Sequence, residues 1–88
     1  MEVGSFVLSN KGHDKERLYV VVKIDKEFAY LVDGKYRLLE NPKKKRLKHI
    51  KDLHQKSCDL IAKLNEKKLY DFEIKTVLQN FDSKLHKN

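Results

Sequence analysis

Short apolar runs separated by polar breaks fill the first half of the chain, and their pattern predicts β-strands. The strongest run is residues 18–25, LYVVVKID, because its valines and isoleucine are β-branched and fit a pleated surface. Two shorter runs, at residues 6–9 and 28–32, predict a strand on either side of it, with a polar break at residues 26–27.

The region after residue 32 predicts a hairpin. Asp33-Gly34 lies between apolar runs, and this pair is preferred in two-residue turns because both positions need a positive φ. The chain then returns as a fourth strand at residues 36–40, which Pro42 ends because proline cannot donate to a strand ladder. A short fifth strand is expected near residues 45–48.

Five short antiparallel strands joined by tight turns cannot bury a core as an open sheet, so they predict a small SH3-like barrel. The two faces of the strand at residues 18–25 can be assigned either way, since both are largely apolar. The expected interior comprises Val7, Val20, Val22, Ile24, Leu31, Leu39 and Leu47.

After residue 52 the apolar residues recur at the spacing of a helix. A first helix is expected to begin at Ser57 or Asp59 and to end in the polar residues 65–68. Its apolar positions are Leu53, Leu60, Ile61 and Leu64. The predicted fold is therefore mainly β with an α-helical C-terminal tail: a five-stranded barrel at residues 1–52 followed by two helices in an extension at residues 53–88.

The second helix is expected to have Asp71 as its N-cap and Glu73 in its first turn, near the positive end of the helix dipole. Its apolar stripe comprises Ile74, Val77, Leu78 and Phe81. Such a stripe most often packs on a neighbouring helix or on the barrel. The alternative is that the helices form a docking surface for a protein partner, such as a ribosomal protein.

Positive charge is concentrated in the middle of the chain. Residues 35–56 hold nine Lys or Arg and two acidic residues, and this local charge of +7 equals the net charge of the whole chain. A localised positive field gathers polyanions. Apolar residues interrupt the run at structural spacing, so it belongs to a folded region and differs in this from a solvated tail.

The length and composition of the chain limit the functions that it can have. Eighty-eight residues make one domain with a thin core, and no apolar run is long enough to span a membrane. The N-terminal residues lack the pattern of a signal peptide, and the single cysteine, Cys58, excludes a disulfide within the chain. We therefore expect a cytoplasmic protein.

Candidate catalytic chemistry is sparse, and we expect no catalytic residues, no metal site, no cofactor and no small-molecule substrate. The four histidines are scattered, and no glycine-rich phosphate loop is present. An enzyme or metal hypothesis rests on His54 and Cys58, whose spacing of four residues would place both on one face of a helix.

Nucleic-acid binding fits the composition better. Lysine outnumbers arginine by seventeen to three, and lysine suits phosphate contacts whereas arginine is the better reader of bases. The pattern therefore favours recognition of backbone and shape, and RNA over duplex DNA. Of Tyr19, Tyr30 and Tyr36, we expect at most one to stack on an unpaired base.

One part of the sequence resembles a known motif. Gly4-Ser5-Phe6-Val7, then Gly12-His13-Asp14-Lys15, then the apolar strand at residues 20–24, is similar to a KOW motif, which forms part of an SH3-like barrel. With the Asp-Gly pair and the Asn-Pro-Lys-Lys-Lys-Arg ribbon, residues 2–50 resemble the KOW-containing large-subunit ribosomal proteins of the fourteen-e class. They are closer still to the short bacterial relatives described as KOW-domain RNA-binding proteins.

The resemblance implies an RNA-binding loop and basic strands beside it. By position it implicates Lys11, Gly12, His13, Lys15 and, at the exit of the loop, Arg17. Many KOW motifs have a second glycine after the loop lysine, where this chain has Glu16, and an acidic residue there weakens a phosphate site. We therefore expect the main contacts from the basic residues that follow, namely Lys35, Arg37, Lys43, Lys44, Lys45, Arg46 and Lys48.

These observations predict a non-enzymatic protein that binds structured RNA, ribosomal or ribosome-associated, through phosphate contacts. The main alternative is an SH3-like protein-interaction module of the transcription or translation machinery. The two differ in their surfaces, since a protein-binding module should expose an apolar groove and an RNA-binding protein a basic face.

Overall fold

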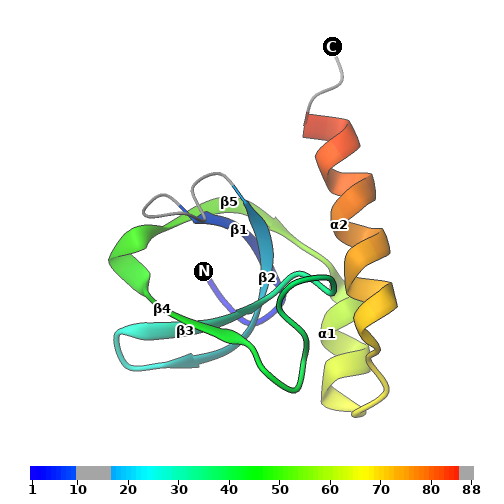
Figure 1. Cartoon of the computed structure of the whole chain (residues 1–88), viewed down its shortest axis with the longest axis horizontal. Coiled ribbons are helices and arrows are strands. Elements are labelled where there is room, and N and C mark those ends of the chain that lie inside the picture. The colour runs from blue at the N-terminus through cyan, green and yellow to red at the C-terminus, as the bar shows by residue number, and fades with distance from the viewer. Residues whose placement is uncertain (10–16, 86–88) are drawn as a thin grey trace.

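The computed structural model describes residues 1–9 and 17–85. Its elements in chain order are β1 (Ser5–Ser9), β2 (Leu18–Asp25), β3 (Phe28–Val32), β4 (Lys43–Arg46), the 3-10 helix η2 (Leu47–His49), β5 (Ile50–Lys56), α1 (Cys58–Asn65) and α2 (Asp71–Leu85). The five strands form one antiparallel sheet in the order β4-β3-β2-β1-β5. Both helices lie on one side of this sheet (Figure 1), so the prediction of a β-rich fold with two C-terminal helices is confirmed.

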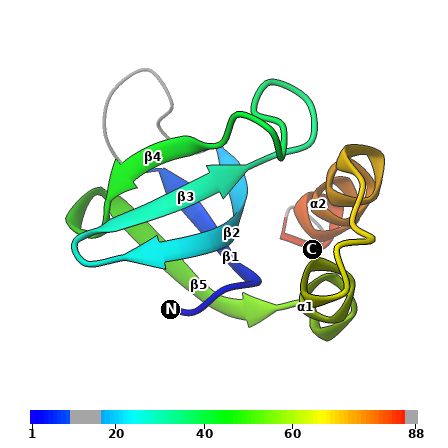
Figure 2. The same cartoon turned by 90° about the horizontal axis from the view of Figure 1, so that it is seen from below.

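The sheet is strongly curled. Its two edge strands, β4 and β5, are consecutive in the chain, and the three residues of η2 are all that join them. A connection this short keeps both edges close together, and the view in Figure 2 shows the strands bending round accordingly. Within the described residues no ladder joins β4 to β5, so the sheet is curled but open.

The loop between β3 and β4 corrects two predictions: Asp33-Gly34 is not a two-residue hairpin turn, and residues 36–40 are not a strand. The Asp33 carboxylate accepts hydrogen bonds from the backbone N–H groups of Lys35, Tyr36 and Arg37 at 2.8–2.9 Å. Because one side chain satisfies three consecutive donors, the chain rolls up around Asp33 and does not extend into a strand.

The tight hairpin lies one strand earlier, between β2 and β3, at the predicted polar break. Lys26, the first of the two turn residues, has a φ of 56°, and a positive φ at this position is typical of two-residue hairpin turns. In both views this turn points away from the helices (Figures 1 and 2). It therefore leaves one end of β2 and β3 uncovered.

The last two strands are displaced from their predicted positions. The strand expected near residues 45–48 begins two residues earlier, as β4, and gives way to η2 at Leu47. β5 was not predicted, and it extends to Lys56, so the expected boundary after residue 52 falls inside it. Leu53, which the helical spacing assigned to the first helix, is a strand residue.

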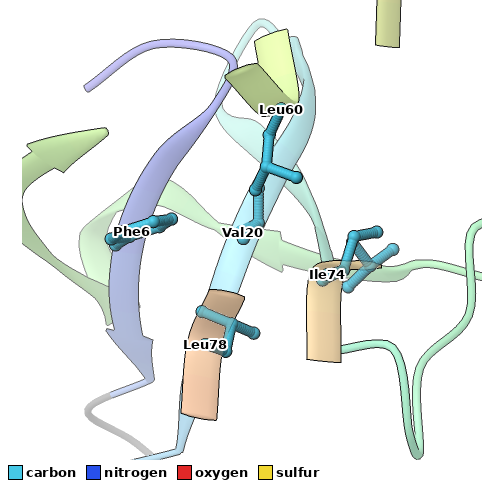
Figure 3. Close-up of a cluster of buried hydrophobic side chains, with 6 residues drawn as sticks. Phe6, Val20, Leu60, Ile74 and Leu78 are labelled. Carbon is cyan, nitrogen blue, oxygen red and sulfur yellow. The ribbon is translucent and has the colours of Figure 1, made fainter. Parts of the chain in front are cut away.

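Apolar side chains bury both faces of the sheet, in two clusters. Figure 3 shows the outer cluster, in which residues of β1 and β2 meet side chains of α1 and α2. Its buried members are Phe6, Val20, Val32, Leu60, Ile74 and Leu78. The inner cluster fills the concave side of the curl and comprises Val7, Tyr19, Val21, Ala29, Leu31 and Ile50.

The expected interior residues are therefore divided between the two sides. Val7 and Leu31 lie in the inner cluster, with Leu47 packed against it, whereas Val20 belongs to the outer cluster, with Val22 and Leu39 packed against it. Ile24 is exposed, so its assignment to the interior is wrong. The β2–β3 register shifts between Val21 and Lys23, so Lys23 lies opposite Tyr30 on the outer face and Ile24 lies opposite Ala29, close to the end of β2, where its side chain is exposed.

The helices begin and pack largely as predicted. Ser57 caps α1 by accepting a hydrogen bond from the backbone N–H of Leu60 at 3.2 Å. The apolar stripe of α2 packs on the sheet, where Phe81 contacts Phe6 with ring centroids 4.7 Å apart. Asp71 begins α2, but its carboxylate accepts a hydrogen bond from the backbone N–H of Leu39, at 2.7 Å.

Candidate nucleic-acid interface

The outer face of β3 changes character along its length. Phe28, Tyr30 and Val32 alternate with inward residues and so share this face. Val32 is fully buried beneath the helices, whereas Phe28 and Tyr30 are only half-buried. Two aromatic rings therefore lie side by side on an uncovered part of the sheet.

Cations from the neighbouring strands lie over these rings. From β4, the Lys44 Nζ is 4.4 Å from the centroid of Phe28, and the Arg46 Cζ is 5.0 Å from it. From β2, the Lys23 Nζ is 5.3 Å from the centroid of Tyr30. We call this group the sheet platform: Lys23, Phe28, Tyr30, Lys44 and Arg46.

The strand register explains the platform. Lys44 pairs with Tyr30 and Arg46 pairs with Phe28 across the β3–β4 ladder, while Lys23 pairs with Tyr30 across β2–β3. Directly opposed residues put their side chains on the same face of a sheet. Exposed cation–π contacts of this kind are worth about 0.5–1 kcal/mol. Arg46 also forms an exposed ion pair with Glu27, at 3.3 Å, and such a pair is worth no more than about 1 kcal/mol, so a phosphate can compete for these cations.

The other two lysines of β4 point to the opposite side. Lys43 pairs with Leu31 and Lys45 with Ala29, so both face the concave side of the sheet and are half-buried. Burial lowers the pKa of both ammonium groups from the ordinary value, and the charge of Lys45 lowers that of Lys43 further. Lys45 also donates a hydrogen bond to the buried Ser9 hydroxyl.

A third aromatic residue with cations over its ring, Tyr36, lies in the loop between β3 and β4. The Arg17 Cζ is 4.9 Å from the ring centroid of Tyr36, and the Lys35 Nζ is 5.0 Å from it. The ring borders a cavity of about 360 Å³ between this loop and α2, which we call the Tyr36 pocket. Its lining residues are Arg17, Leu18, Asp33, Lys35, Tyr36, Lys75, Leu78, Gln79 and Asp82.

The structure thus separates the sequence-predicted basic residues into groups. Lys44 and Arg46 belong to the sheet platform, and Arg17 and Lys35 to the Tyr36 pocket. Lys48 is exposed on η2, beside a hollow that Arg46 also lines. Arg37 is half-buried, and its backbone carbonyl accepts hydrogen bonds from the N–H groups of residues 33 and 34. Lys11, Gly12, His13 and Lys15 lie outside the described residues.

The three candidate tyrosines differ in exposure. Tyr19 is buried in the inner cluster, and desolvation, followed by the charge of Asp33, raises the pKa of its phenol. Tyr30 is half-buried on the sheet platform, and Tyr36 is 63% exposed. Tyr19 therefore cannot stack on a base, whereas the other two can.

The structure removes the basis of the metal hypothesis. His54 lies in β5 with a φ of 59° and Cys58 begins α1, so the two do not share a helix face. Cys58 is exposed. Among residues 1–9 and 17–85, no group of three or more His, Cys, Asp or Glu side chains is arranged to hold a metal ion. In the same residues, no helix is both long and apolar enough to cross a membrane.

Sequence reasoning missed three residues that the structure adds to these surfaces: Lys23, Phe28 and Lys75. The sequence pattern contained a signal for Phe28, because aromatic residues at positions 28 and 30 alternate with apolar ones and therefore share a face. Lys75 carried no such signal, since its place beside Tyr36 depends on how α2 packs against a distant loop.

Comparison of the chain with models of protein families gives no match, and neither does comparison with the curated proteins.

Proposed function

We propose that this chain is a cytoplasmic, non-enzymatic RNA-binding protein with a KOW-type, SH3-like barrel, and that its ligand is ribosomal RNA or a ribosome-associated RNA. The sheet platform carries the proposal. It combines Lys44, Arg46 and Lys23, which suit phosphate oxygens, with Phe28 and Tyr30, whose rings suit stacking on bases.

Two further observations support this function. The net charge of +7 arises in residues 35–56, and β4, at an edge of the sheet, places two of their cations on the outer face. The five antiparallel strands form one curled, open sheet, and the KOW-type barrel is proposed from the resemblance of the sequence. The choice of ribosomal RNA over other structured RNA comes from that resemblance.

The test is the salt dependence of RNA binding. Replacing all four residues of β4 would disturb the fold, because the side chains of Lys43 and Lys45 are half-buried. The double variant Lys44→Ala/Arg46→Ala removes only the outward cations. Measured by fluorescence anisotropy with a labelled RNA hairpin, its plot of log affinity against log salt should flatten by about two units, one for each lost phosphate contact.

A matched control removes the same charge elsewhere. Lys68 and Lys84 are exposed in the helical region, and Lys68→Ala/Lys84→Ala should leave the slope nearly unchanged. If both double variants lower the slope equally, the protein attracts RNA through its overall charge and the platform is not the interface.

Sedimentation tests the ribosomal assignment. On a sucrose gradient at low salt, tagged protein from cell extract should migrate with the large ribosomal subunit, and about 200 mM salt should release it because phosphate contacts weaken steeply with ionic strength. Protein that stays at the top of the gradient at both salts would contradict ribosome association, whatever its affinity for a purified hairpin.

The alternative, a protein-interaction module, is favoured by one observation on the helical side. Tyr70 and Phe72, at the start of α2, are 62% and 68% exposed and stack with ring centroids 5.9 Å apart. Exposed aromatic residues are enriched where proteins dock. If Tyr70→Ser/Phe72→Ser abolishes co-sedimentation but leaves RNA affinity intact, the protein is held by a protein partner.

A further inference from the structure

We propose that the Tyr36 pocket holds one unpaired nucleotide of the bound RNA, with its base stacked on Tyr36. This inference rests on the proposed function and assigns a second subsite to it. The sheet platform would contact the backbone and stack on bases, while the Tyr36 pocket would take a further unpaired base, which a continuous duplex does not offer.

The first support is the shape and lining of the pocket. Its volume of about 360 Å³ is at the lower end of the range for small-ligand sites, about 300–1,000 Å³. Tyr36 of the loop and Lys75, Leu78 and Gln79 of α2 all line it. An unpaired base binds where an aromatic ring for stacking lies beside groups that can hydrogen-bond its edge, and this lining supplies both.

The second support is the charge around the ring. Arg17 and Lys35 lie within 5.0 Å of the centroid of Tyr36, and Lys75 also lines the pocket. Asp33 and Asp82 contribute two carboxylates to the lining, so the three cations leave it with a net positive charge that suits the phosphates on either side of an inserted base. Stacking of a base on an aromatic ring is stronger than an exposed cation–π contact, so a base can displace a cation from the ring face.

The third support is that the pocket is already built. A side-chain carbon at Gly34 would lie 2.3 Å from the backbone carbonyl oxygen of Asp71, so the loop and α2 are in direct backbone contact. The hydrogen bond from the Leu39 N–H to the Asp71 carboxylate, at 2.7 Å, fixes the loop to α2 a second time. A preorganised site loses less entropy when it binds its ligand.

The position relative to the sheet platform also fits. β3 runs from the platform toward the pocket, and Asp33, which lines the pocket, is three positions after Tyr30, about 10 Å along an extended strand. Neighbouring nucleotides of one RNA strand can therefore reach both surfaces. A continuous duplex cannot enter the pocket, because its bases are paired and stacked.

The experiment compares two RNA hairpins with identical stems, one with a single unpaired adenosine bulge and one fully paired in the stem. Tyr36→Ala should weaken binding to the bulged hairpin by between about 5-fold and 100-fold, the loss expected for one base stacked on an aromatic ring, and leave binding to the paired hairpin unchanged. Tyr36→Phe keeps the ring and should restore the affinity. Because Tyr36 is 63% exposed, neither change should alter the thermal midpoint of unfolding.

A spectroscopic readout locates the base directly. With 2-aminopurine in place of the bulged adenosine, the wild-type protein and Tyr36→Phe should quench its fluorescence by stacking, and Tyr36→Ala should not. Equal quenching by all three proteins would overturn the assignment of the pocket.

The outcomes separate the two proposals. If the wild-type protein binds neither hairpin, the proposed RNA-binding function itself fails. If it binds both equally and Tyr36→Ala does the same, RNA binding stands and the pocket assignment fails. If adenosine monophosphate alone shifts the amide resonances of Lys75 and Gln79 while the bulge has no effect on affinity, the pocket takes a free nucleotide and its assignment to RNA is overturned.

Discussion

The two ends of the outer face of the sheet are formed by the same alternating strand positions, but the helices cover only one of the two ends. At one end, Val20 and Val32 are buried beneath Leu60, Ile74 and Leu78 of the helices. At the other end, Phe28 and Tyr30 lie outside the cluster that packs against α1 and α2, and cations from the adjacent strands lie over their rings.

This difference shows how so small a chain divides its surface between stability and binding. At 88 residues it buries only a modest share of its surface, so every helix residue packed on the sheet counts toward stability. The helices cover only part of the face, and the rest remains available to a ligand. We therefore expect substitutions at the covered end to change stability and those at the open end to change binding.

The largest effect is expected at the covered end. Ile74 is fully buried between α2 and the sheet, so Ile74→Ala should lower the free energy of unfolding by about 2–5 kcal/mol through lost burial and a cavity. Urea unfolding followed by circular dichroism measures this. Thr76→Ala, at an exposed position on the same helix, should change stability by less than about 0.5 kcal/mol. Equal effects would mean that the helices do not form a common core with the sheet.

The next effect concerns the loop that follows the covered end of β3, where the loop meets α2. Gly34 has a φ of 77°, and a side chain there would collide with the α2 backbone. Gly34→Ala should therefore cost about 1–3 kcal/mol of stability through backbone strain. It should also weaken binding to the bulged hairpin more than binding to the paired one, because the loop moves away from α2. Unfolding midpoints and anisotropy on one protein preparation test both results.

At the open end the expected effect is on RNA affinity. Tyr30→Ala should weaken RNA binding by about 1–3 kcal/mol, the usual value of one stacked base, with a smaller change in stability. Anisotropy at fixed salt measures the affinity. Tyr30→Phe, which keeps the ring, is the matched control. If Tyr30→Ala lowers stability as much as Ile74→Ala does and leaves RNA affinity intact, the side chains at the open end belong to the hydrophobic core and not to an RNA interface.

The smallest effect concerns the ion pair that links the two helices. Lys63 donates a hydrogen bond to Glu73 and so holds the pKa of that carboxyl below its ordinary value of 4.5, with the Tyr70 N–H adding to the effect. A carboxyl whose pKa is lower in the folded state contributes stability above its ordinary pKa and loses it as the pH falls through the folded value.

Glu73→Gln should therefore lower the unfolding midpoint slightly near pH 7 and have less effect below about pH 4, where the wild-type carboxyl becomes protonated. Thermal unfolding at several pH values tests this. Glu66→Gln is the matched control, since the Glu66 ion pair with Lys68 is long, at 4.0 Å, and exposed. Parallel curves for the wild-type protein and Glu73→Gln at all pH values would contradict the assigned pKa direction.

Local chemistry accounts for what could be predicted of this fold. The β-branched run of β2, the Ser57 cap and the apolar stripe of α2 each act within a few residues, and each formed the expected element. The prediction failed at Asp33-Gly34, where the Asp33 side chain bonds the backbone N–H groups that a strand would have used. It also failed at β5, whose polar sequence is held in a strand by pairing with β1.

Of the candidate site, the sequence alone determined that positive charge gathers in residues 35–56 and that aromatic side chains alternate along β3. Only the tertiary structure decided which of those charges meet the aromatic rings. The register of the β3–β4 ladder places Lys44 and Arg46 on the outer face of the sheet and Lys43 and Lys45 on its concave side. The packing of α2 against the β3–β4 loop forms the pocket beside Tyr36. The physical reason is that charge and alternation are properties of the chain, whereas contact between strands and helices distant in sequence depends on how the whole chain packs.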